Sequence, residues 1–188
     1  MALTPEPIER QFLTNIKSIF DDYIAEQILL NPSVGFNVYV ERTYPPQQTD
    51  LPAVFVYFDQ ADSDRYAIGK SVTYDGTIRF DLLASEPAGS NDSDSASAYR
   101  VLYLYQQIRT ALYRSENYDL GMAPGVVGKR SPLSFARLET KDEHRERRVS
   151  AATCEMQIQY RIEHEQPDYP DLEVLSIDED KIKLTINY

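Results

Sequence analysis

The sequence predicts an α+β fold, with a mixed or antiparallel sheet of about five strands covered by two α-helices. Three observations predict this fold. Val72 to Leu82 alternates apolar and polar residues, Leu51 to Phe58 is a continuous apolar run, and two further segments carry apolar residues at spacings of three and four. Strand side chains alternate between two faces, whereas helical side chains recur about every 3.6 residues. The first two segments are therefore expected to be strands and the other two helices.

The first helix is expected to begin with Thr4 as N-cap and Pro5 in the first helical position, and to end near Asn31. A single apolar stripe runs along it and should cover the sheet. The stripe consists of Ile8, Phe12, Ile16, Phe20, Tyr23, Ile24 and Ile28.

The second helix is expected from Ala98 to Tyr113, after an exposed loop from Glu86 to Ser97 whose last serines can act as N-caps. Its main stripe is Leu102, Tyr105, Ile108 and Leu112, and it is widened by Val101, Leu104 and Ala111. A helix that is apolar over so much of its circumference is expected to pack on the sheet and also to contact another surface.

The alternating segment should have one buried and one polar face. The buried set is Val72, Tyr74, Ile78, Phe80 and Leu82, and the polar set is Thr73, Asp75, Thr77, Arg79 and Asp81. Gly76 occupies a buried position, which suggests a bulge or the close approach of a helix.

The remaining strands are expected on either side of this segment. Phe36 to Glu41 alternates and should be short, whereas Leu51 to Phe58 should be central and buried on both faces, with Pro52 at its start. Asn117 to Pro132 is expected to be a loop. Leu133 to Thr140 and a long alternating strand from Ala152 to Ile162 should flank a charged turn or projecting hairpin tip at Lys141 to Arg148.

Two prolines, Pro167 and Pro170, separate a predicted α+β domain at 1–165 from an extension at 166–188. The extension is expected to form a hairpin from Leu172 to Ile177 and Ile182 to Tyr188. A lone hairpin is marginally stable in water, so it should pack on the main body or on a neighbouring molecule.

The net charge is -11, which disfavours binding to nucleic acid but suits a surface along which DNA must slide. A single cysteine excludes an internal disulfide. The first residues lack the pattern of a signal peptide, and nowhere do 18 apolar residues run together, so we expect a soluble protein in the cytoplasm and no membrane partner. The 14 tyrosines can serve as core residues or at subunit contacts.

Candidate catalytic groups are sparse, and we expect no catalytic residue, no metal site and no cofactor. Cys154 falls on the apolar side of its strand and is interpreted as a core residue. His144 and His164 form no zinc-binding pattern, and no glycine-rich phosphate loop is present. The alternative is a divalent-metal-dependent enzyme that uses the carboxylates at Asp59 to Asp64 and Asp92 to Asp94.

The densest basic group lies in the predicted charged tip and comprises Lys141, Arg145, Arg147 and Arg148. Glu143 and Glu146 lie among these residues, so internal pairing in a solvated turn is one interpretation. The other is that the tip contacts an acidic partner.

The order of elements, with LPAVFVYF, then TYDGTIRFDLLA, then a tyrosine-rich helix and a final hairpin, resembles the tail terminator proteins of long-tailed bacteriophages. The resemblance covers roughly Pro5 to Glu163. It implies a structural virion protein, made in the host cytoplasm, that forms a hexameric ring at the head-proximal end of the tail. Such a ring caps the tube, stops its growth and joins the head.

The resemblance also implies partners: other copies of the chain, the tail tube protein, the head connector or head-completion protein and, in contractile tails, the sheath. In a ring the polar strand face would meet a neighbour or the channel, so Arg79, flanked by Asp75 and Asp81, and Tyr105 on the second helix are candidate interface residues. Another head-tail joining protein or a tube protein is the nearest alternative function.

Overall fold

The computed structural model describes residues 6–31, 34–42, 50–63, 71–87, 93–138 and 147–163. Two α-helices, α1 (Ile8–Leu30) and α2 (Ser93–Leu112), are accompanied by a short 3-10 helix, η3 (Ser115–Asn117). The strands are β1 (Asn37–Val40), β2 (Ala53–Ser63), β3 (Ser71–Pro87), β4 (Val127–Arg130), β5 (Ala136–Leu138) and β6 (Arg147–Glu163). The predicted α+β class is confirmed.

One mixed sheet joins the six strands in the order β1-β2-β3-β6-β4, and β5 pairs with the same side of β6 as β4 does. β1 and β2 are parallel, and every other pairing is antiparallel. The strand run from Leu51 lies inside the sheet as β2, but the middle position belongs to β3, so its prediction as the central strand is wrong by one place.

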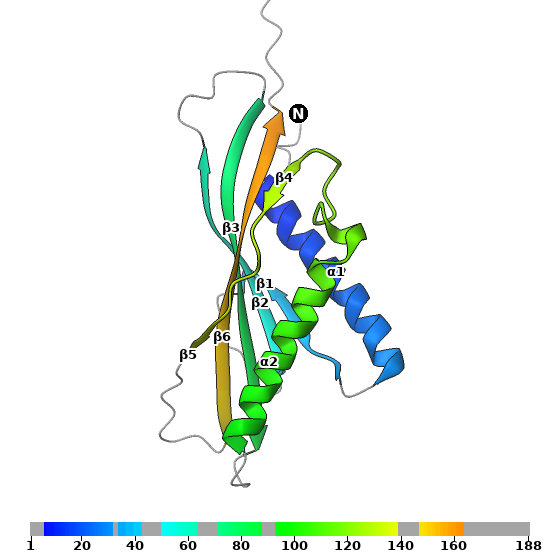
Figure 1. The fold of residues 1–188 in the computed structure, drawn as a ribbon, viewed down its shortest axis with the longest axis vertical. Coiled ribbons are helices and arrows are strands. Elements are labelled where there is room, and N and C mark those ends of the chain that lie inside the picture. The colour runs from blue at the N-terminus through cyan, green and yellow to red at the C-terminus, as the bar shows by residue number, and fades with distance from the viewer. Residues whose placement is uncertain are drawn as a thin grey trace, which may run out of the picture.

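Both helices lie against the same face of the sheet (Figure 1). Their apolar side chains meet those of β2, β3 and β6 in one core. Its largest fully buried members are Phe12, Ile16 and Phe20 from α1, Leu104, Ile108 and Leu112 from α2, Leu120 from the segment after η3, and Ile78, Phe80, Leu82, Met156 and Tyr160 from the sheet. The alternation in β3 and β6 therefore predicted the buried face correctly, and Cys154 is a core residue as expected.

β3 and β6 form the backbone of the sheet. They pair without interruption from Ser71 with Glu163 to Pro87 with Arg147. At about 3.3 Å per residue, each 17-residue strand is roughly 56 Å long. The pair runs the length of the molecule and extends beyond the helices at one end (Figure 1).

The start of α1 differs from the prediction. The helix begins at Ile8 with Pro7 in the N-cap position, whereas Thr4 and Pro5 lie outside the described residues. A proline disfavours helical geometry in the residue before it, so Glu6 stays outside the helix. The end at Leu30, next to Asn31, agrees with the prediction.

α2 begins at Ser93, five residues before the predicted start, and β3 continues to Pro87. Within the predicted loop from Glu86 to Ser97, residues 86–87 are therefore strand and residues 93–97 helix, while residues 88–92 lie outside the described residues. Ser97 is no N-cap: it is buried inside α2, with its hydroxyl oxygen 2.8 Å from that of Ser150 in β6.

The apolar faces of α2 also differ from the prediction. The buried stripe is Val101, Leu104, Ile108, Ala111 and Leu112, whereas Leu102 is 47% exposed. Because apolar residues occupy most of the helix circumference, two stripes fit the sequence, and packing on the sheet selects one of them.

Gly76 pairs in register with Ala61 and Ile158 and is not itself a bulge, and the atoms nearest to a Cβ at this position belong to side chains of β2 and β6. A Cβ atom there would lie 2.7 Å from Cζ of Phe58 and 3.1 Å from Cε1 of Tyr160, so two aromatic rings require the glycine. The bulge is in the facing strand, between Phe58 and Gln60.

The predicted loop at Asn117–Pro132 begins at the last residue of η3 and contains β4, which pairs with β6. Arg130 at the end of β4 holds this segment to α2. Its Nη1 donates hydrogen bonds of 3.1 Å to the carbonyl oxygens of Leu112 and Asn117, and its guanidinium lies over the rings of Tyr113 and Tyr118. Burial lowers the pKa of this guanidinium.

The predicted strand at Leu133–Thr140 is reduced to β5, and residues 139–140 lie outside the described residues. The predicted turn at Lys141–Arg148 lies partly outside them as well, but its last two residues begin β6. Whether β5 and β6 form a projecting hairpin, and what the extension at 166–188 forms, stay predictions.

Candidate interaction surfaces

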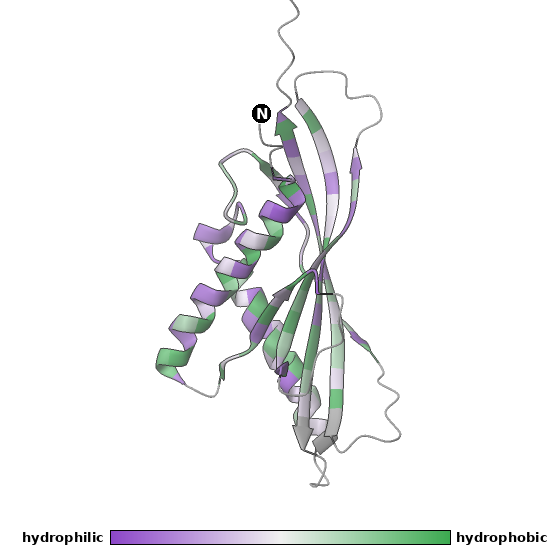
Figure 2. Ribbon diagram, turned by 180° about the vertical axis from the view of Figure 1, so that it is seen from behind, coloured by the Kyte–Doolittle hydropathy of each residue, from purple (hydrophilic) through white to green (hydrophobic). Residues whose placement is uncertain are grey.

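The sheet face opposite the helices carries polar side chains along its long strands. Figure 2 shows the alternation of hydrophilic and hydrophobic residues along them. Thr73 and Asp75 on β3 are exposed, and Thr77, Arg79 and Asp81 are partly exposed. These five residues belong to the face that the sequence predicts as polar, and we call this side of the molecule the open sheet face.

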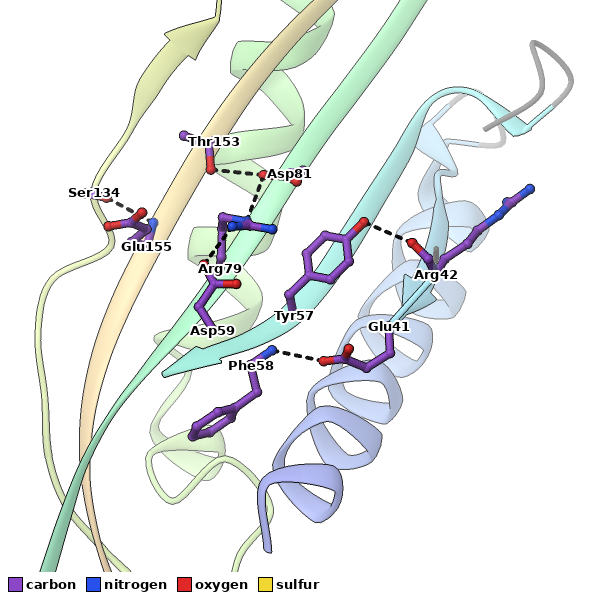
Figure 3. A network of polar contacts seen from close by, with 10 residues as sticks. All are labelled: Glu41, Arg42, Tyr57, Phe58, Asp59, Arg79, Asp81, Ser134, Thr153 and Glu155. Carbon is purple, nitrogen blue, oxygen red and sulfur yellow. Dashed lines mark hydrogen bonds and ion pairs between the residues drawn. The ribbon is translucent and has the colours of Figure 1, made fainter. Parts of the chain in front are cut away.

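Arg79 lies at the centre of a polar network on the open sheet face (Figure 3). Its Nη1 donates a hydrogen bond of 2.7 Å to Oδ2 of Asp59, and its guanidinium lies 4.9 Å from the centre of the Tyr57 ring. Its Nε is 3.5 Å from Oδ1 of Asp81, an ion pair without hydrogen-bond geometry. Asp81 in turn accepts a hydrogen bond of 2.9 Å from Thr153. The network therefore joins β2, β3 and β6.

Negative charge surrounds this single guanidinium. Asp59 and Asp81 flank Arg79, and Glu155 is its register partner on β6. Burial, assisted by the carboxylate of Asp81, raises the pKa of Tyr57. The Arg79 side chain is 35% exposed, so solvent screens these interactions in part. The region can receive a polar partner while repelling phosphate groups.

A second group on the same face lies towards the edge strand β1. The rings of Tyr39 and Phe55 stack with centroids 5.2 Å apart, and the guanidinium of Arg42 lies 4.4 Å from the Tyr39 ring centre. Tyr57 donates a hydrogen bond of 3.3 Å to the carbonyl oxygen of Arg42 (Figure 3). Glu41 accepts one of 3.1 Å from the backbone N–H of Phe58. These contacts fix the end of β1 against β2.

The predicted candidate Asp75 lies away from Arg79 along β3. Its Oδ1 accepts a hydrogen bond of 3.2 Å from Gln159, and its register partner on β2 is Asp62. Asp59, not Asp75, therefore pairs with Arg79. The sequence gives little sign of this, because the bulge after Phe58 places Asp59 beside the guanidinium.

The described residues contain neither a cluster of metal-binding side chains nor an exposed cysteine. Among them no group of three or more His, Cys, Asp or Glu side chains could hold a metal ion. Asp64 and Asp92 lie outside these residues, and the side chain of Asp94 is not described. Cys154 is fully buried, and burial, together with the carboxylate of Asp81, raises the pKa of its thiol to about 12. It is held as a thiol.

The helix layer has an exposed apolar surface of its own. Tyr99 is 72% exposed, Leu102 47% and Tyr103 50%, and we call these three residues the α2 outer face. A shallow hollow there is lined by Ala96, Tyr99, Arg100, Leu102, Tyr103 and Gln106. The expectation that α2 contacts something beyond the sheet stays a prediction, and Tyr105 does not belong to this surface. Tyr105 packs on Phe135 with ring centroids 4.8 Å apart and donates a hydrogen bond to the carbonyl oxygen of Leu133.

Most of the basic tip lies outside the described residues. Lys141 and Arg145 lie outside the described residues, and so does His144. The backbones of Arg147 and Arg148 belong to β6 and pair with Pro87 and Glu86 of β3.

No helix in the described part of the chain is long and apolar enough to cross a membrane. No family model matches the chain, and no curated protein is significantly similar to it in sequence.

Proposed function

We propose that this protein is a structural subunit of a ring that closes the head-proximal end of a bacteriophage tail. In this proposal the ring, expected to be a homohexamer, caps the tail tube, stops its elongation and presents the surface to which the head attaches. The protein acts through the shape of its surfaces and uses no cofactor.

The observation that supports this proposal most is that the helix layer and the sheet expose two different candidate contact surfaces, on opposite sides of the molecule. The α2 outer face lies on the helix side, and the Arg79 network lies on the open sheet face. Subunits of a closed ring contact a neighbour on each side through unlike surfaces, because a head-to-tail contact is heterologous. A monomer in water gains nothing from three large apolar side chains about half exposed or more on one helix.

The charge of the chain supports a ring through which DNA passes. The net charge is -11, and the guanidinium of Arg79 is flanked by carboxylates. A negatively charged channel wall would let DNA slide without being held. The place in the tail rests on the resemblance of the strand and helix segments to tail terminators.

Mass measurement in solution is the first test. Light scattering or native mass spectrometry of the purified chain, alone and with the tail tube protein, is expected to give a ring of about six copies. A monomer under both conditions would contradict the proposal.

Electron microscopy of tails assembled without this protein separates it from its nearest alternatives. A tail terminator predicts tubes of uncontrolled length. Tubes of normal length that fail to join heads would instead indicate a head-completion protein, and the absence of tubes would indicate a tube protein.

A further inference from the structure

The α2 outer face lacks a cover among the described residues. Tyr99, Leu102 and Tyr103 follow one another along the first half of α2, on the side away from the sheet. Apolar side chains gathered on one helix face in this way mark an interaction site.

The charge of α2 favours an acidic occupant. Its 20 residues contain two arginines, Arg100 and Arg109, and one acidic residue, Asp94, in a chain with a net charge of -11. A partner that brings apolar side chains together with negative charge would therefore complement this helix better than a basic partner.

The chain itself contains a segment of this chemistry. Residues 164–188 carry seven acidic and two basic side chains. Within them Ile182, Leu184, Ile186 and Tyr188 alternate with polar residues, which predicts a strand with one apolar face. A hairpin formed with Leu172 to Ile177 would pair its own backbone groups and would still need a surface for that apolar face.

The distance from Glu163 to Leu102 disfavours binding of the C-terminal segment to the α2 outer face of its own molecule. The hydroxyl oxygens of Ser97 and Ser150 are 2.8 Å apart, and Glu163 lies 13 residues beyond Ser150 along β6, or about 43 Å. Allowing for the five residues along α2 from Ser97 to Leu102, at least about 30 Å separates Glu163 from Leu102. Figure 1 shows the end of β6 and the start of α2 at opposite ends of the molecule.

The linker before the predicted hairpin is short. Residues 164–171 span at most roughly 29 Å when fully extended. Within one molecule, bringing Leu184 to the α2 outer face would require most of this linker to be extended, whereas binding to a neighbouring copy avoids this loss of chain entropy.

We propose that the α2 outer face of one copy binds the C-terminal segment Leu172–Tyr188 of a neighbouring copy. The apolar side of Ile182 to Tyr188 covers Tyr99, Leu102 and Tyr103, and the acidic residues of the segment lie near the arginines of α2. The contact is head-to-tail, so its repetition yields a closed ring or an open chain. It requires self-association but holds whether or not the ring belongs to a phage tail.

Disulfide trapping in the full-length chain tests this contact. Leu102→Cys and Leu184→Cys are made in separate chains, mixed in equal amounts and oxidised mildly, so that a 102–184 link can form only between copies. The native Cys154 is fully buried and stays out of the reaction. Leu29→Cys mixed with Leu184→Cys is the matched control, because Leu29 is 86% exposed and lies on α1.

The proposal predicts about tenfold more 102–184 link than 29–184 link, measured by mass spectrometry of the linked peptides. Equal yields would overturn it. A chain carrying both Leu102→Cys and Leu184→Cys is expected to give links between copies. Links found only within one copy would show that the segment binds its own molecule and would overturn the proposed contact with a neighbour. A ring detected by solution mass together with equal yields would refute this contact alone, whereas a monomer both alone and with the tail tube protein would refute the contact and the proposed function together.

Discussion

Gly76→Ala is expected to destabilise the protein, although alanine usually stabilises a strand relative to glycine. The added Cβ would lie 2.7 Å from Cζ of Phe58 and 3.1 Å from Cε1 of Tyr160, well inside the normal carbon contact of about 3.5 to 4.0 Å. The Phe58 ring packs against the rings of Phe12 and Tyr160, with centroids 6.3 and 6.1 Å away, so moving it away from the added Cβ would disturb these aromatic contacts.

The expected magnitude follows from two opposing effects. Overpacking costs about 1–3 kcal/mol, and replacement of glycine in a strand returns about 0.5–1 kcal/mol. The free energy of unfolding should therefore fall by roughly 1–2 kcal/mol. For a chain of this size that lowers Tm by roughly 2–8 °C.

Urea denaturation and calorimetry measure the change. Gly128→Ala in β4 is the matched control, because its Cβ would meet the nearest atoms at 3.6 Å, an ordinary contact, and should change stability by less than about 0.5 kcal/mol. Phe58→Leu removes the closest ring atom, so it should recover part of the cost in a double-mutant cycle. A Gly76→Ala variant as stable as the parent, or a cost that Phe58→Leu leaves unchanged, would refute the steric argument.

Three further predictions concern other buried or paired groups. Arg130→Ala leaves the carbonyl oxygens of Leu112 and Asn117 without the donor that Arg130 provides, and it should lower the free energy of unfolding by about 2–3 kcal/mol. An unaltered urea midpoint would contradict the role of Arg130 in holding the β4 segment to α2. Burial raises the pKa of Cys154 from 9.0 to about 12, so the thiol ionises at lower pH in the unfolded state than in the folded state. Its contribution to the free energy of unfolding is therefore complete below pH 9 and is lost as the pH rises towards 12. The parent should thus lose up to about 1.4 kcal/mol per pH unit more than Cys154→Ala in that range, and equal slopes would disprove the effect. Arg79→Ala should cost only about 0.5–1.5 kcal/mol, because its ion pairs are about one-third exposed, and a much larger loss in denaturation would show that the network is more buried than its exposure indicates.

The sequence predicts the buried face of the sheet well, because the period of a strand leaves little choice. Once Phe80 is buried, Ile78 and Leu82 must be too, and the same holds for Cys154 and Met156 in β6. The first half of β2 was predictable for another reason, since a continuous apolar run from Ala53 to Val56 is expected of a strand buried on both faces.

Features that depend on a partner elsewhere in the chain could not be predicted in this way. β4 has one inward apolar residue, Val127, and becomes a strand because β6 offers an edge for pairing. On α2 the sequence does not decide whether Leu102 or Val101 faces the sheet. The pairing of Arg79 with Asp59 depends on a bulge that no local signal marks.

The long ladder between β3 and β6 also has a consequence for how fast the chain folds. Its paired residues are on the order of 60 to 90 positions apart in the sequence, and α2, β4 and β5 all lie between them. Contacts so distant require large loops to close before they yield any stabilisation, so folding is expected in the millisecond-to-second range. Until the ladder closes, both long strands present unpaired edges. The amount of chain available for assembly at any moment would then be set by the rate at which this one pairing forms.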